Sequence, residues 1–132
     1  KRFERLVAYA RTQGVKLTVF VSPVHHRQID LIYEKKLGET YERWKRELAK
    51  ITEYYDFSGP SGICSDDRWW WDSSHIRAEG GTLIFARLAG DPDGIVPADF
   101  GYLVTERNVD DHVNRVRQGV RPLDLRSLDP SS

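Results

Sequence analysis

The sequence predicts an α/β protein in which helices cover both faces of a mainly parallel sheet. Segments with helical periodicity alternate with short apolar segments, in the order helix, strand, helix, strand, helix. The segment 15–21 is apolar on both faces in its second half, which is typical of a strand buried between two helical layers. The chain has 132 residues, of which 39% are hydrophobic and 30% charged, so it has room for one globular domain.

The N-terminal residues are predicted to form an amphipathic helix that ends at Gly14. Its apolar side chains recur at the spacing of one helix face, namely Phe3, Leu6, Val7 and Ala10. The strand at 15–21 follows, and Pro23 ends it because proline cannot continue the hydrogen-bond ladder. Residues 26–51 are predicted to be helical, with Gly38 as a break or kink. The apolar face of this segment carries Leu37, Tyr41, Trp44, Leu48 and Ile51.

The middle of the chain is predicted to hold a second strand at 52–57, a loop at 58–71 and a third helix at 73–88. Gly80 and Gly81 fall inside this helix, where each costs about 1 kcal/mol relative to alanine. Their presence predicts that the helix lies close to the sheet.

The C-terminal part begins with a segment at 90–101 that is rich in glycine, proline and aspartate and predicts a linker. An extended piece at 102–105 and a polar helix at 109–118 follow, with Asn108 as the helix cap. The residues from Arg121 onward are expected to be loose. The predicted core of the whole chain consists of Leu6, Val19, Val21, Leu37, Trp44, Leu48, Phe57, Ile84 and Leu88.

Composition excludes several classes of function. Twenty lysines and arginines balance twenty aspartates and glutamates, so no net field would attract a nucleic acid or an anionic membrane. The single cysteine, Cys64, excludes an internal disulfide, and no arrangement of residues supplies it with a base for nucleophilic chemistry. The apolar runs are far shorter than the roughly 20 residues that a spanning helix needs, and no signal peptide is visible. The sequence indicates no cofactor.

Two observations lead us to expect a piece of a longer protein. The chain has no methionine, and its first residues already have the pattern of a helix interior. Two or three strands also make a small sheet, where sheets usually have about four to six strands.

The sharpest local feature is Asp72, Ser73, Ser74 and His75, which follow the predicted loop and open the predicted third helix. At a spacing of three residues in one helical turn, the Asp72 carboxylate can accept a hydrogen bond from Nδ1 of His75. This contact would fix the imidazole tautomer and leave Nε2 as a base, which a serine nucleophile requires. The competing interpretation is that Asp72 caps a helix and His75 is an ordinary surface residue.

The order of elements around this motif resembles the C-terminal half of an SGNH (GDSL-type) hydrolase. The resemblance rests on the segments 19–23 and 71–76, and it is closest to SGNH-like proteins of bacterial cell-envelope polysaccharide acetylation systems. It implies a flavodoxin-like three-layer sandwich, with its C-terminal part in residues 1–90 and a linker and helical extension in 91–132. It also implies that His75 is the catalytic base and Asp72 the residue that orients it, in an esterase or acetyltransferase acting on O-acyl groups of a carbohydrate. The parent protein would then be periplasmic or membrane-associated.

The chain departs from that family in one important respect. It contains no Gly-Asp-Ser motif, and neither Ser22 nor Ser58 lies in a matching context. The resemblance therefore implies that another chain or a missing N-terminal half completes the domain and supplies the nucleophile and the oxyanion-hole donors. The expected partner of the catalytic protein is an ester or polysaccharide substrate. The alternative is a non-catalytic module of the same fold that binds carbohydrate or pairs its exposed sheet edge with a partner chain.

Four other residues are candidates for substrate binding. His25 and His26 follow a strand at the edge where open α/β sheets bind ligands, although both also fit a surface pair at a helix start. A zinc site formed by these two with His75 needs three converging ligands, which nothing in the spacing imposes. Three consecutive tryptophans cannot all enter one core, so Trp69 or Trp71 is expected to be exposed, where it can stack on a sugar. The other possibility is that two are core residues and one packs under the C-terminal tail. Asp56, at the end of a strand, is expected to be structural.

Overall fold

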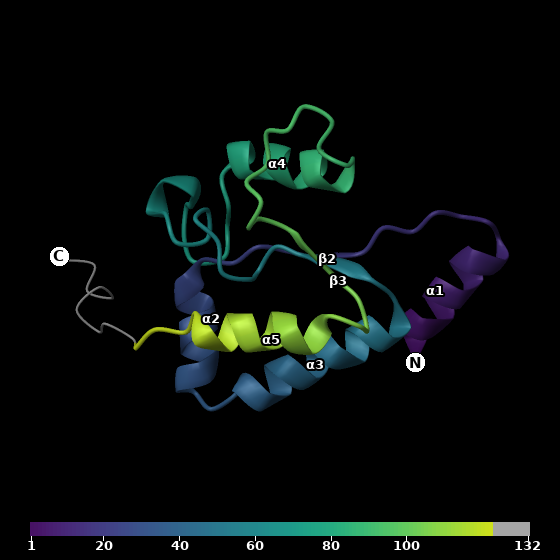
Figure 1. Ribbon diagram of the computed structural model, residues 1–132, viewed down its shortest axis with the longest axis horizontal. Helices are drawn as coiled ribbons and strands as arrows, with labels where there is room; N and C mark the ends of the chain where they lie inside the picture. Colours follow the sequence, from purple (N-terminus) through teal and green to yellow (C-terminus); the bar gives the residue numbers. More distant parts are fainter. Residues whose placement is uncertain (123–132) are drawn as a thin grey trace.

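A computed structural model describes residues 1–122 and shows a mixed α/β fold with a small three-stranded sheet (Figure 1). Residues 123–132 lie outside the described part, as does most of the tail that was expected to be loose. The elements in chain order are α1 (Arg2–Thr12), β1 (Phe20–Val21), α2 (His26–Glu34), α3 (Gly38–Ile51), β2 (Tyr54–Asp56), the 3₁₀ helix η1 (Asp67–Trp69), α4 (Ala78–Leu88), β3 (Tyr102–Val104) and α5 (Val109–Gln118).

The sheet has the strand order β1-β2-β3 and is mixed rather than mainly parallel. β1 pairs with β2 in parallel, with Phe20 opposite Tyr55. β3 pairs with β2 in antiparallel fashion, with Leu103 opposite Tyr55. The expectation of a mainly parallel sheet is therefore wrong for β3. A short apolar run has the same period in either direction, so the local sequence does not encode strand direction.

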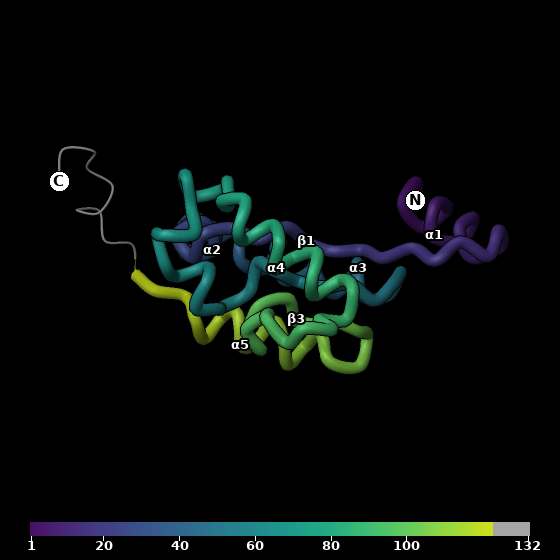
Figure 2. The backbone as a smooth tube through the Cα atoms, turned by 90° about the horizontal axis from the view of Figure 1, so that it is seen from above, coloured from purple at the N-terminus to yellow at the C-terminus, as the bar shows by residue number. Residues whose placement is uncertain are grey.

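Helices cover the two faces of the sheet, with α4 on one side and α3 and α5 on the other (Figure 1). The core is correspondingly divided into two clusters. The α4 side buries Phe57, Ile63, Cys64, Trp70, Ile84, Val96 and Phe100. The side of α3 and α5 buries Ala49, Tyr54, Val104, Val109 and Val113. Figure 2 shows α1 at the opposite end of the molecule from α2.

The predicted core is correct in part. Phe57 and Ile84 are buried, and four more residues are half-buried against the clusters, namely Val19, Val21, Leu48 and Leu88. Leu6, Leu37 and Trp44 are exposed, so their assignment to the core is wrong. The segment 90–101, expected as a linker, instead adds Val96 and Phe100 to the core.

Helix α3 explains much of this error. Its buried positions include Glu42, Lys45 and Ala49, while Trp44 lies on the outer side. The charged side chains face inward because each finds a partner there: Glu42 binds Arg117, and Lys45 binds Asp56. The apolar stripe in the sequence therefore did not mark the buried face.

Candidate functional site

The turn at residues 72–75 stands at the tip of a short hairpin. Trp70 and Ile76 form an isolated antiparallel bridge, and the Trp71 amide donates to the His75 carbonyl oxygen at 2.9 Å. Helix α4 begins only at Ala78, so the expectation that His75 lies within a helix is wrong. The Asp72 side chain accepts hydrogen bonds from the backbone amides of the turn, and such local hydrogen bonds compete with helix formation.

Asp72 and His75 are hydrogen-bonded, as the sequence predicted. Nδ1 of His75 lies 2.7 Å from Oδ2 and 2.9 Å from Oδ1 of Asp72. Asp72 Oδ1 also accepts the backbone amides of Ser74 at 2.8 Å and of His75 at 2.9 Å. The contact thus arises from an aspartate-stabilised turn rather than from a shared helical turn.

The negative charge of Asp72 determines which nitrogen of the neutral His75 ring carries the proton. The Ser74 backbone amide, followed by the hydrogen bond from His75, lowers the pKa of the Asp72 carboxyl to about 2. An ionised carboxylate can only accept, so a neutral His75 carries its proton on Nδ1 and presents the lone pair of Nε2. The His75 side chain is 73% exposed, and within residues 1–122 no hydrogen bond occupies Nε2. The arrangement is that of an oriented base open to the solvent.

The turn lies beyond the carboxyl end of β1. The His25 amide donates to the Ser73 carbonyl oxygen at 3.0 Å, and His25 follows β1 by four residues. This is the edge at which open α/β sheets bind ligands.

His25 is a buried structural group, with only 3% of its surface exposed. Its Nδ1 accepts the Arg27 amide at 3.2 Å, and its Nε2 donates to Asp67 at 2.7 Å. Burial lowers the pKa of the His25 ring, against the opposing effect of Asp67. Both ring nitrogens are therefore occupied, and neither is free for a substrate.

His26 faces a different pocket from the Asp72 turn. Its Nδ1 lies 2.9 Å from Asp30 Oδ2, and the ring lines a pocket together with Ser58 and Val116. The His25 and His26 rings lie beside each other, with centroids 4.5 Å apart, but each binds a different carboxylate, Asp67 and Asp30 respectively. Within the described residues, no group of three or more histidine, cysteine, aspartate or glutamate side chains is placed to hold a metal ion.

The three tryptophans have three different positions. Trp70 is buried and its Nε1 donates to the Ile63 carbonyl oxygen at 2.9 Å, while Trp69 packs half-buried against the same cluster. Trp71 is 70% exposed, which confirms that at least one of them is accessible. The Arg77 guanidinium lies 3.8 Å from the centre of the Trp71 ring. Trp71 also lines a pocket with Asp72 and several other residues, namely His25, Arg27, Asp67, Trp70 and Ser73.

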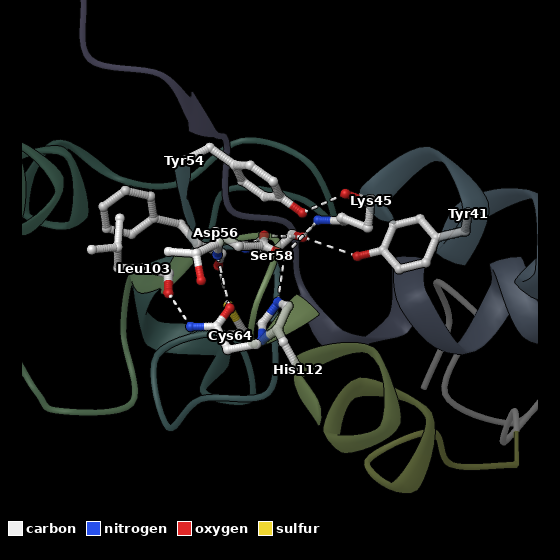
Figure 3. A network of polar contacts seen from close by, with 11 residues as sticks. Tyr41, Lys45, Tyr54, Asp56, Ser58, Cys64, Leu103 and His112 are labelled. Atoms are coloured by element: carbon white, nitrogen blue, oxygen red, sulfur yellow. Dashed lines mark hydrogen bonds and ion pairs between the residues drawn. The ribbon is translucent and has the colours of Figure 1, made fainter. Parts of the chain in front are cut away.

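Sequence reasoning missed a buried polar network between β2, α3 and α5 (Figure 3). Asp56 Oδ2 accepts from Lys45 Nζ at 2.5 Å and from His112 Nε2 at 2.8 Å, and Oδ1 accepts the Ser58 hydroxyl at 2.6 Å. Burial alone would raise the pKa of the Asp56 carboxyl, but Lys45 and His112 outweigh it and hold that pKa well below its usual range. Asp56 at the end of a strand was the only sequence signal of this network.

Comparisons with known proteins add no identification. No protein-family model, no curated protein and no solved structure matches the chain. In residues 1–122, no helix has the length and apolar character needed to cross a membrane.

Proposed function

We propose that this chain carries the Asp–His part of the catalytic apparatus of an SGNH-type serine esterase or acyltransferase. The observation that supports the proposal is the Asp72–His75 contact of 2.7 Å, with Nε2 exposed beyond the carboxyl end of β1. The helices on both faces of the sheet agree with a flavodoxin-like arrangement, which is part of the same proposal.

In the proposed reaction, His75 Nε2 removes the proton of a serine hydroxyl as its oxygen attacks the ester carbonyl. Asp72 accepts the hydrogen bond from Nδ1–H throughout and stabilises the imidazolium. The imidazolium then donates the Nε2 proton to the leaving alcohol. Water or an acceptor hydroxyl next releases the acyl group from the serine by the reverse proton transfers. The serine comes from outside this sequence, because no Gly-Asp-Ser is present. Ser74 is unsuitable, since its Oγ lies 3.4 Å from Nδ1, on the Asp72 side of the ring.

The substrate class in this proposal is an O-acetylated carbohydrate. The exposed indole of Trp71 offers an apolar face for a sugar ring beside Asp72. Arg27 and Asp67 line the same pocket and supply a donor and an acceptor for sugar hydroxyls.

A second candidate function is a non-catalytic carbohydrate-binding module of the same fold. The 70% exposure of Trp71 favours it, because stacking on a sugar needs no nucleophile. The two candidates differ in whether His75 is required for turnover, and this difference defines the experiment.

The test measures acetyl-ester hydrolysis by the intact protein that contains this sequence. His75→Ala should lower kcat by about 10²–10⁴-fold, because the variant lacks the general base. Asp72→Asn should lower it by a similar or smaller factor, since the imidazole remains but loses its orienting partner. Asp110→Asn is the matched control, because Asp110 is an exposed, ion-paired carboxylate on α5.

Three outcomes decide between the candidates. Wild-type turnover in His75→Ala would overturn the catalytic proposal. Carbohydrate binding without turnover in the intact protein would favour the second candidate. Esterase activity of the 132-residue chain alone, abolished by a serine-directed reagent, would require a nucleophile within this sequence and contradict the proposed division of the site.

A further inference from the structure

Burial contributes little to stabilising the contact between Asp72 and His75. The side chains of Asp72 and His75 are 57% and 73% exposed, so water competes for both partners. The contact therefore depends on the geometry of the turn between them. What fixes this turn decides whether His75 is oriented.

The turn is anchored at two places. At its base, the bridge between Trp70 and Ile76 closes the hairpin. At its tip, and counting the residues that the structure describes, only Ser73 is hydrogen-bonded to another element: its carbonyl oxygen accepts the His25 amide at 3.0 Å, and its Oγ accepts from Gln28 Nε2 at 2.7 Å. Both partners of Ser73 belong to the start of α2.

We propose that Gln28 is a positioning residue that holds the Asp72–His75 pair in its active geometry by fixing Ser73. This inference rests on the proposed function for its catalytic meaning. Ser73 lies directly between Asp72 and Ser74, so its placement directs the Ser74 and His75 amides at Asp72 Oδ1. Gln28 touches neither Asp72 nor His75 through a hydrogen bond, and its effect passes through the turn.

The start of α2 is rigid enough to serve as this support. The buried ring of His25 caps the helix by accepting the Arg27 amide, and it is held by Asp67 on its other nitrogen. The same ring meets Trp70 edge-on, with centroids 5.8 Å apart. Trp70 belongs to the core, so the helix start, the hairpin base and the core form one connected unit.

The first experiment records the ring ¹⁵N chemical shifts of His75 in the 132-residue chain, because these shifts report the ratio of the Nδ1–H to the Nε2–H tautomer. Gln28→Met keeps the side-chain length and removes the hydrogen-bond donor. A hydrogen bond of ordinary strength corresponds to about a fivefold change in equilibrium, so this ratio should fall by up to about fivefold. Gln118→Met is the matched control, an exposed glutamine on α5, and should leave the ratio unchanged.

Two further variants separate positioning from a general loss of structure. Gln28→Glu should restore the tautomer ratio toward wild type, because its carboxylate can accept the Ser73 hydroxyl proton. Ser73→Ala removes the same hydrogen bond from the other side, so Gln28→Met should have no further effect in that background. Ser73→Ala also provides the measurement if Gln28→Met does not fold.

The second experiment measures turnover of the intact protein. Gln28→Met should lower kcat by about fivefold and leave KM unchanged, because the base is misplaced while the substrate pocket remains. An unchanged His75 tautomer ratio in Gln28→Met and Ser73→Ala would overturn the positioning role, whatever the activity. A changed ratio with full activity in His75→Ala would instead keep the positioning role and refute the proposed function, so the two failures are distinguishable.

Discussion

Asp56 lies at the end of β2 with a side chain that has no exposed surface, and it binds Lys45 from α3 and His112 from α5 (Figure 3). The Ser58 amide and hydroxyl occupy the other carboxylate oxygen. A buried charge is tolerated only when it is paired and hydrogen-bonded, and here both conditions are met. The same contacts join one strand to two helices.

Replacing Asp56 with asparagine should strongly destabilise the protein. The variant would leave the buried Lys45 ammonium without its counter-charge, and breaking a buried pair in this way costs about 3–5 kcal/mol. Urea denaturation at neutral pH measures the change in the free energy of unfolding. Asp110→Asn removes an exposed carboxylate of α5 and should cost less than about 1 kcal/mol. Similar effects of the two substitutions would contradict a structural role for the Asp56 network.

The two polar clusters differ in how far they could be predicted from the sequence. Asp72 and His75 are three residues apart, and any tight turn brings such residues together, so the spacing predicted the contact although the expected helix was absent. His112 and Asp56 are 56 residues apart, and their contact depends on how α5 packs on the sheet. Local sequence carries no information on such packing, so the network remained hidden.

At the scale of elements, α4 contains two adjacent glycines in different surroundings. A Cβ on Gly80 would lie 2.5 Å from Ile76 Cγ1, whereas a Cβ on Gly81 would meet nothing within 4 Å. A close approach thus occurs at Gly80 alone, and it is to the hairpin rather than to the sheet, as the sequence had predicted for both glycines. Its neighbour is the side chain of Ile76 in the hairpin, next to His75.

Alanine substitutions at these two glycines should have opposite effects on stability. Gly81→Ala should raise the free energy of unfolding by about 0.5–1 kcal/mol, because alanine has the higher helix propensity and the space is open. Gly80→Ala should lower it, because Ile76 must move away from the new methyl group. Thermal unfolding of the two variants is a matched comparison. Equal stabilisation by both would show that Ile76 yields without cost.

Element boundaries were predicted best where a local signal ends an element. The N-terminal helix and the polar helix at 109–118 were confirmed. The segment 26–51 is two helices, separated by a turn in which Lys36 has a φ of 58°. Of the predicted strand at 15–21, only Phe20 and Val21 pair, because a strand exists only where a neighbour accepts its hydrogen bonds.

At the scale of the whole molecule, ion pairs join α3 to α5 and join both helices to the sheet. Glu42 on α3 binds the guanidinium of Arg117 on α5 through both oxygens, at 2.8 Å and 2.5 Å. Asp56 extends the connection to β2. The stability of the layered arrangement therefore depends on two carboxylates that remain ionised in the folded state.

Stability should consequently fall in acid. The Arg117 hydrogen bond outweighs burial and lowers the pKa of Glu42, and the pKa of Asp56 is also well below its usual range. A carboxyl whose pKa is lower in the folded state adds stability above its unfolded pKa, which is about 4, and loses it as the pH falls toward the folded value. The free energy of unfolding should therefore decrease from about pH 5 to 2. The lowered pKa of the buried His25 adds an earlier decrease below about pH 7, because the unfolded histidine takes up a proton more readily than the folded one.

Urea titrations at a series of pH values measure this slope, and the variants identify its source. Glu42→Gln should reduce the loss of stability between neutral and acid pH, because this side chain no longer takes up a proton on unfolding. Asp56→Asn should reduce this loss of stability further, although the variant is already less stable than the wild type at neutral pH. Asp72 also has a low pKa, but it is exposed, so Asp72→Asn should alter the slope much less. If Asp72→Asn flattened the acid dependence more than Asp56→Asn, the exposed turn rather than the buried network would be the principal acid-sensitive element of the fold.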